Sequence, residues 1–121
     1  MASPYEQIVT PARALAACVD NWLGSSGKND LGQESFRLRV LDASLKTRQW
    51  MGTGCRDRYT TAPAPQVLDD LIPYNVDFEA SRFLAKEILH EAGFFLSDSL
   101  QVCRSQTVAL QRGLGAAEEQ Y

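Results

Sequence analysis

A long proline-free segment in the last third of the chain places the strongest constraint on the fold. Asn75 is a good helix N-cap, and the acidic residues Asp77 and Glu79 follow where a helix dipole favours negative charge. Residues at alternating steps of three and four lie on one face of a helix. In this segment they are Leu84, Ile88, Ala92, Phe95, Ser99, Cys103, Gln106 and Leu110. The spacing predicts an amphipathic helix over residues 76–112.

The length of this predicted helix bears on how the chain assembles. At about 1.5 Å per residue it spans about 55 Å, whereas a small domain is roughly 30 Å across. A lone glycine costs a helix only about 1 kcal/mol relative to alanine, so we expect the helix to run unbroken or to kink near Gly93. Its far half would then pack on another chain. The alternative is a break near Gly93, with Ser97 or Asp98 capping a second helix.

A second helix is predicted near the N-terminus. Thr10 can accept a hydrogen bond from an unpaired amide, and Pro11 brings the backbone angle that the first helical position needs. Gly24 is predicted to end this helix, and the polar, turn-forming residues 24–32 predict a loop. The apolar stripe of the helix consists of Leu15, Cys18, Val19 and Trp22.

Residues 34–50 allow two interpretations. Phe36, Leu38 and Val40 alternate with arginines as in a strand, which favours a hairpin. Leu38, Leu41 and Leu45 recur at helical spacing instead. We favour the helix because the segment contains no proline or glycine and exceeds ordinary strand length.

The prolines between residues 60 and 73 predict the connection to the last helix. Residues 55–65 favour extended backbone and predict an ordered loop. Pro65 can open a short helix that ends near Ile72, ahead of Pro73.

The predicted fold class is therefore all-α, a small bundle of three to five helices with a long C-terminal helix, unbroken or kinked near Gly93. The 121 residues suit one domain, with residues 1–9 and 113–121 frayed.

Composition and cysteine usage narrow the class of protein. No run approaches the roughly 20 apolar residues of a membrane span, and no secretory signal is visible, so a cytoplasmic location without membrane contact is predicted. Cys18, Cys55 and Cys103 are odd in number and lack CxxC spacing, which argues against a disulfide framework or a zinc site. The only histidine, His90, lies three residues after Glu87, which is half of a carboxylate metal motif. We therefore predict no metal and no cofactor.

Catalytic motifs are missing from the sequence. No serine lies in a G-x-S-x-G turn, and no phosphate-binding glycine loop is present. Cys55 beside Arg56 is the candidate nucleophile if the chain completes an enzyme site in a complex, since a nearby cation lowers the pKa of a thiol. No catalytic residue is predicted, and the chain is expected not to be an enzyme.

Charge is distributed unevenly along the chain. The chain total is −3, yet between residues 36 and 59 six basic side chains oppose only two acidic ones. Such a segment can attract an anionic partner or the acidic face of another subunit. The basic residues are Arg37, Arg39, Lys46, Arg48, Arg56 and Arg58.

These features predict a small non-catalytic helical interaction protein, such as an accessory subunit, adaptor, chaperone or inhibitor. Its partner is predicted to be a protein, including a second copy in a homodimer. The alternatives are a nucleic-acid-binding accessory protein that uses residues 37–58 against phosphates, and a small subunit of an enzyme complex. The candidate binding residues are the six basic residues together with Phe94, Phe95 and Leu96.

Overall fold

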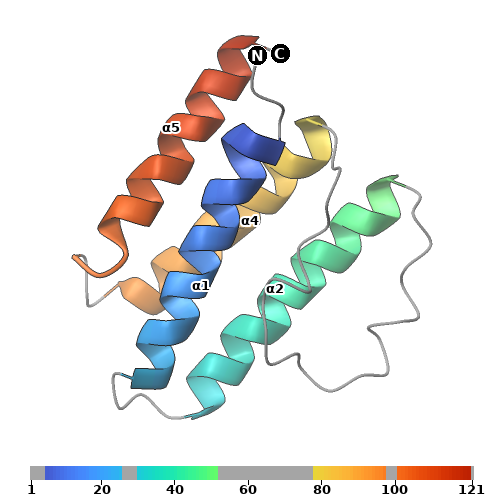
Figure 1. Cartoon of the computed structure of the whole chain (residues 1–121). Coiled ribbons are helices and arrows are strands. Elements are labelled where there is room, and N and C mark those ends of the chain that lie inside the picture. Colours follow the sequence, from blue (N-terminus) through green and yellow to red (C-terminus); the bar gives the residue numbers. More distant parts are fainter. Residues whose placement is uncertain (1–4, 26–29, 52–77, 98–100, 121) are drawn as a thin grey trace.

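The computed structural model describes residues 5–25, 30–51, 78–97 and 101–120, and within them every side chain except those of residues 5, 30 and 47–51. These residues form a π-helical turn and four α-helices and contain no strand, which confirms the predicted all-α bundle (Figure 1). The elements are η1 (Tyr5–Val9), α1 (Thr10–Ser25), α2 (Asp30–Met51), α4 (Phe78–Leu96) and α5 (Arg104–Gln120).

Helix α1 lies at the centre of the bundle. It contacts α2, α4 and α5, while α2 packs most extensively on α4 (Figure 1). The helices α2 and α5 lie on opposite sides of α1, and η1 packs against the C-terminal half of α5. One contiguous core therefore joins all five elements.

The N-terminal helix begins at Thr10 as predicted. Leu15 and Val19 of the predicted stripe are buried, and Cys18 and Trp22 pack against the core at its edge. The helix extends past the predicted stop at Gly24. The hydroxyl of Ser25 donates hydrogen bonds to the carbonyl oxygens of Asn21 and Trp22, at 2.9 and 3.4 Å, and so satisfies carbonyls of the last turn.

The helical interpretation of residues 34–50 is confirmed and the hairpin is wrong. Phe36, Val40 and Ala43 are buried at helical spacing in α2. The helix starts at Asp30, inside the stretch that was predicted to be a loop. Its N-terminal turn packs beside the end of α1, because Gln33 bonds to Asp20 across the two helices.

The expectation of an unbroken or kinked C-terminal helix is wrong. Helix α4 continues through Gly93 and ends at Leu96, and α5 begins only at Arg104. Cys103 has a φ of 57°, in the left-handed region, which a right-handed helix cannot pass through. The backbone amide and the hydroxyl of Thr107 both donate to the carbonyl of Cys103, at 3.0 and 2.9 Å, and fix the start of α5. The chain turns back after α4, and α5 packs mainly on α1 and η1, so helix length no longer requires a second chain.

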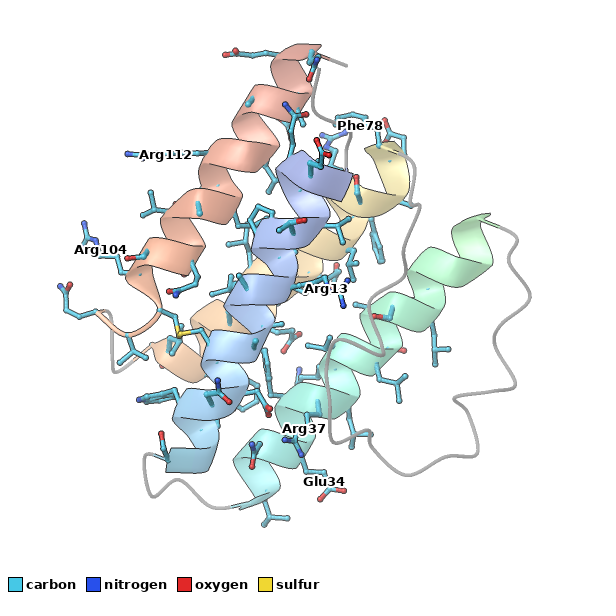
Figure 2. All side chains as sticks on the ribbon, in the orientation of Figure 1. Arg13, Glu34, Arg37, Phe78, Arg104 and Arg112 are labelled. Atoms are coloured by element: carbon cyan, nitrogen blue, oxygen red, sulfur yellow. A yellow bond between two sulfur atoms is a disulfide. The ribbon has the colours of Figure 1, made fainter. Side chains whose placement is uncertain are left out.

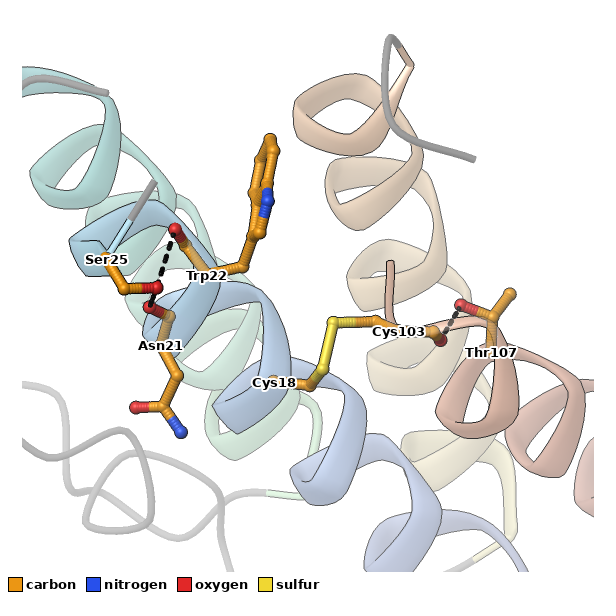
Figure 3. The surroundings of a disulfide bond; sticks show 6 residues. All are labelled: Cys18, Asn21, Trp22, Ser25, Cys103 and Thr107. Atoms are coloured by element: carbon orange, nitrogen blue, oxygen red, sulfur yellow. Dashed lines mark hydrogen bonds between the residues drawn. A yellow bond between two sulfur atoms is a disulfide. The ribbon is translucent and has the colours of Figure 1, made fainter. Parts of the chain in front are cut away.

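A disulfide joins α1 to the residue that precedes α5. The sulfurs of Cys18 and Cys103 are bonded, with their Cα atoms 5.9 Å apart and a separation of 85 positions in sequence (Figure 3). The sequence argument against a disulfide is therefore wrong for this pair. Local cysteine spacing could not reveal this bond, because the fold brings together two cysteines that lie far apart in the sequence.

Fraying was predicted for residues 1–9 and 113–121, but the described residues at both ends of the bundle are helical. Ile8 and Val9 in η1 are fully buried, and α5 reaches Gln120 with Leu114 and Ala117 buried. The structure therefore places residues 5–9 in η1 and residues 113–120 in α5, each with buried side chains. The two ends hold each other, since η1 packs directly against α5.

A glycine on α5 makes this close approach possible. The backbone oxygen of Gln7 lies where a Cβ atom on Gly113 would stand, and main-chain atoms cannot rotate away. We expect Gly113→Ala to lower the free energy of unfolding by about 2 kcal/mol, within the usual range for overpacking. Chemical denaturation measures the change.

The control for this substitution lies on the same helix. A Cβ on Gly115 meets nothing within 4 Å, so Gly115→Ala should instead raise stability by about 0.5–1 kcal/mol through helix propensity. Equal effects of the two substitutions would show that the contact with Gln7 does not limit the packing of η1.

Two predicted elements, the loop at residues 55–65 and the short helix at residues 65–72, lie outside the described residues. In the part of the chain that the structure describes, no helix combines the length and the apolar character needed to cross a lipid bilayer.

Candidate interaction surface

Arg37, a predicted binding residue, forms an ion pair between two helices of the bundle. Its guanidinium extends from α2 towards α1 (Figure 2). Its Nε and Nη2 donate to the two carboxylate oxygens of Asp20, at 2.8 and 3.0 Å. Gln33 adds hydrogen bonds to the carboxylate and the backbone oxygen of the same residue, at 3.0 and 3.1 Å. Both charged side chains are largely buried, so this bidentate pair joins α1 to α2 rather than facing a partner.

Lys46 remains on the surface but has an acidic neighbour. Its Nζ lies 3.1 Å from Oδ2 of Asp42, one turn earlier on α2. The hydrogen bond to Asp42 and the charge of that carboxylate raise the pKa of Lys46 above its ordinary value. Both side chains are more than half exposed, so the pair contributes little to stability and leaves this cation locally neutralised.

Arg39 is the basic residue that contacts a predicted apolar binding residue. Its Nη1 lies 3.3 Å from Oε2 of Glu91 on α4. Its guanidinium carbon lies 5.6 Å from the centre of the Phe94 ring, within the distance of a cation–π contact. Arg39 is about half exposed and Phe94 is 64% exposed, so both remain accessible from outside. We call these two residues the Arg39–Phe94 surface.

Aromatic contacts fix this surface to the core. Phe36 is fully buried on α2, and its ring meets that of Phe95 edge to face, with centroids 5.4 Å apart. Phe95 in turn meets Phe94 edge to face at 5.2 Å. Such T-shaped contacts are the favoured geometry for aromatic pairs. The exposed ring of Phe94 is therefore supported by two rings beneath it and by Arg39 beside it.

Two further predicted binding residues point towards the bundle interior. Phe95 is partly buried against the core, and Leu96 is buried. The side chains of Arg48, Arg56 and Arg58 lie outside the described residues. Of the nine candidates, the structure brings together Arg39 and Phe94 in the open.

Two leucines on α2 are exposed, and neither was among the predicted binding residues. Leu31 is 72% exposed and Leu38 is 45% exposed, seven residues apart and hence on one face of the helix. The sequence suggested that Leu38 faces the core because it shares helical spacing with Leu41. Leu41 is buried and Leu45 packs against the core, but burial at Phe36, Val40 and Ala43 centres the buried face of α2 away from Leu38.

The described residues contain no group of three or more His, Cys, Asp or Glu side chains that could hold a metal ion. His90 is exposed on α4, and Cys18 and Cys103 are joined in the disulfide. Cys55, the candidate nucleophile, lies outside the described part of the chain. The Arg39–Phe94 surface offers apolar and cationic contact beside the carboxylate of Glu91.

No protein-family model, curated protein or solved structure matches the chain.

Proposed function

We propose that this protein is a non-catalytic helical interaction protein that acts through protein–protein contacts, with the Arg39–Phe94 surface at the centre of the contact. The roles that fit are accessory subunit, adaptor, chaperone and inhibitor. The proposed partner is a protein, including a second copy of this chain in a homodimer. The observation that carries the proposal is the exposure of Phe94, a large aromatic side chain that is already held in place.

Aromatic and arginine side chains dominate the energetics of protein interfaces. Binding usually costs free energy because flexible side chains become ordered at the interface. The Phe94 ring is positioned in advance by Phe95, and the Arg39 guanidinium by Glu91, so both would lose less freedom than isolated surface residues. Burial of the exposed ring would then stabilise the complex.

The ion pairs of the basic residues weaken the case for nucleic-acid binding. Arg37, Arg39 and Lys46 each form an ion pair with a carboxylate, so phosphate binding would have to displace Asp20, Glu91 or Asp42. The Arg37–Asp20 pair is also largely buried, which makes its separation costly. Nucleic-acid binding therefore stays second to protein binding, as does a role as a small subunit of an enzyme complex.

Self-association provides the first test. We expect Phe94→Ser to weaken dimerisation at least tenfold, because loss of an interface aromatic typically costs more than 1 kcal/mol. Sedimentation velocity over a range of protein concentrations measures the dissociation constant. Arg39→Lys keeps the positive charge but loses the planar guanidinium, and it should weaken the dimer less.

Leu31→Ser is the matched control, because Leu31 is even more exposed than Phe94 and lies on a different helix. It should leave the dissociation constant unchanged. An equal effect of Leu31→Ser and Phe94→Ser would indicate general stickiness rather than a defined contact. A wild-type protein that stays monomeric at all concentrations would remove the homodimer.

A cytoplasmic location is also a proposal, and the disulfide makes it testable. Disulfides persist in oxidising compartments, and those found in the cytosol are usually catalytic or redox-sensing. Alkylation of thiols in intact cells, before any reduction, reports the state of Cys18 and Cys103. Free thiols would support the cytoplasmic location, whereas an oxidised pair throughout would favour an oxidising compartment.

A further inference from the structure

A cavity of about 420 Å³ opens between α4 and α5, on the side of the bundle away from α2. Its volume lies within the range of pockets that hold small molecules. The wall contributed by α4 includes Leu89 and Leu96, and the wall contributed by α5 includes Val108. The described residues that line the cavity are Leu89, Ala92, Gly93, Leu96, Val102, Arg104, Thr107, Val108 and Gln111.

The chemistry of the lining divides the cavity into an apolar body and a small polar group. Among the lining residues that the structure describes, Arg104 carries the charge and none is acidic. Arg104 is exposed at the first turn of α5 (Figure 2), where the helix dipole adds to its positive charge. Thr107 and Gln111 follow at helical spacing on the same side of α5.

Gly93 keeps the α4 wall open. A Cβ atom built at this position meets nothing within 4 Å, although the residue lines the cavity from a helix interior. A glycine in a helix interior costs stability relative to alanine, and no close contact of the backbone explains its presence here. The missing side chain leaves room for a ligand.

We propose that this cavity binds a small amphipathic carboxylate, namely a free medium-chain fatty acid. Its alkyl tail lies between α4 and α5 against Leu89, Leu96 and Val108. Its carboxylate meets the guanidinium of Arg104 at the rim. A single cation beside an apolar cavity selects for one negative charge on an otherwise apolar molecule.

The test uses octanoate with the oxidised full-length protein, below the concentration at which octanoate forms micelles. NMR titration should shift the methyl resonances of Leu89, Leu96 and Val108 in a saturable manner. Octanoate should bind more tightly than octanol, which has the same chain length without the charge. Each methylene between hexanoate and octanoate should tighten binding about fourfold, the value for a fully buried CH₂ group.

Two variants test the contacts of the alkyl tail and those of the carboxylate separately. Gly93→Leu places a side chain in the cavity and favours the helix, so it should remove the binding of octanoate and octanol without loss of stability. Arg104→Gln should weaken octanoate about tenfold and leave octanol unchanged. Gly115→Leu is the matched control, because Gly115 also has open space but lies away from the cavity, and it should bind like wild type.

Phe94→Ser distinguishes this proposal from the protein–protein function, because it alters the Arg39–Phe94 surface and leaves the cavity lining intact. It should bind octanoate as wild type does. Octanoate shifts that centre on Phe94, or unchanged binding by Gly93→Leu, would overturn the proposal. Absence of saturable binding to the wild-type protein would do the same.

Discussion

Reduction of the Cys18–Cys103 disulfide is expected to lower the free energy of unfolding by about 4 kcal/mol. The bond closes a loop of 85 residues, and a cross-link over a loop of this size removes much of the conformational freedom of the unfolded chain. Cys103 is also nearly buried in the core and carries the left-handed backbone that starts α5. Loss of the bond should therefore release the N-terminal end of α5 from α1.

Urea denaturation with and without a reductant measures this effect. The Cys55→Ser background removes the third thiol of the chain, which could otherwise exchange with the disulfide. The double substitution of Cys18 and Cys103 by serine should reproduce the reduced protein without any reductant. Equal denaturation midpoints in the oxidised and reduced forms would contradict the proposed contribution of the bond.

Phe36→Ala is expected to lower the free energy of unfolding by about 4 kcal/mol. Phe36 is the largest fully buried side chain, and it packs edge to face against Phe95 across the α2–α4 contact. Truncation to alanine removes the buried ring and leaves a cavity, a combination that costs about 3–5 kcal/mol for phenylalanine. Thermal or chemical denaturation in the oxidised state measures the change.

Two other substitutions calibrate this result. Phe36→Leu keeps most of the apolar volume and should cost about half as much. Leu31→Ala removes an apolar side chain of the same helix that is 72% exposed, and it should change stability by less than about 0.5 kcal/mol. A loss below about 1 kcal/mol for Phe36→Ala would show that α2 does not depend on this ring to pack on α4.

The helices α1 and α2 were predictable from their local sequence. Thr10 and Pro11 lie at the first turn of α1, where the sequence predicted a helix start, although the π-helical turn η1 leads into α1 without a break. The length of the segment and its lack of proline or glycine also decided correctly between helix and hairpin for α2. The extra N-terminal turn at Asp30 is held partly by the contact of Gln33 with Asp20, which the sequence does not reveal.

The break between α4 and α5 could not be predicted in the same way. Gly93 was the expected weak point, yet α4 passes through it and ends three residues later. The left-handed conformation occurs at Cys103, whose side chain is tied to Cys18. A helix-period pattern that continues across residues 97–103 describes which residues face the core, and it does not require the backbone between them to be helical.

The candidate surface was predictable only in part. Helical periodicity marked Phe94, Phe95 and Leu96 as a group, but adjacent residues on a helix point about 100° apart. Only the packing of α2 on α4 decides that Phe95 turns inward and Phe94 outward. The basic residues behave likewise, since the partner of Arg37 lies 17 residues away in sequence on another helix.

The Cys18–Cys103 bond also determines what happens when the backbone is cut. All of α2 and α4 lie between the two cysteines, so a protease that nicks the chain once within that interval yields two fragments that stay in one molecule. Such a nicked protein should run as a single species on a non-reducing gel and separate only after reduction. Because the fragments remain tethered, they should also be able to re-form the bundle after unfolding as a unimolecular reaction.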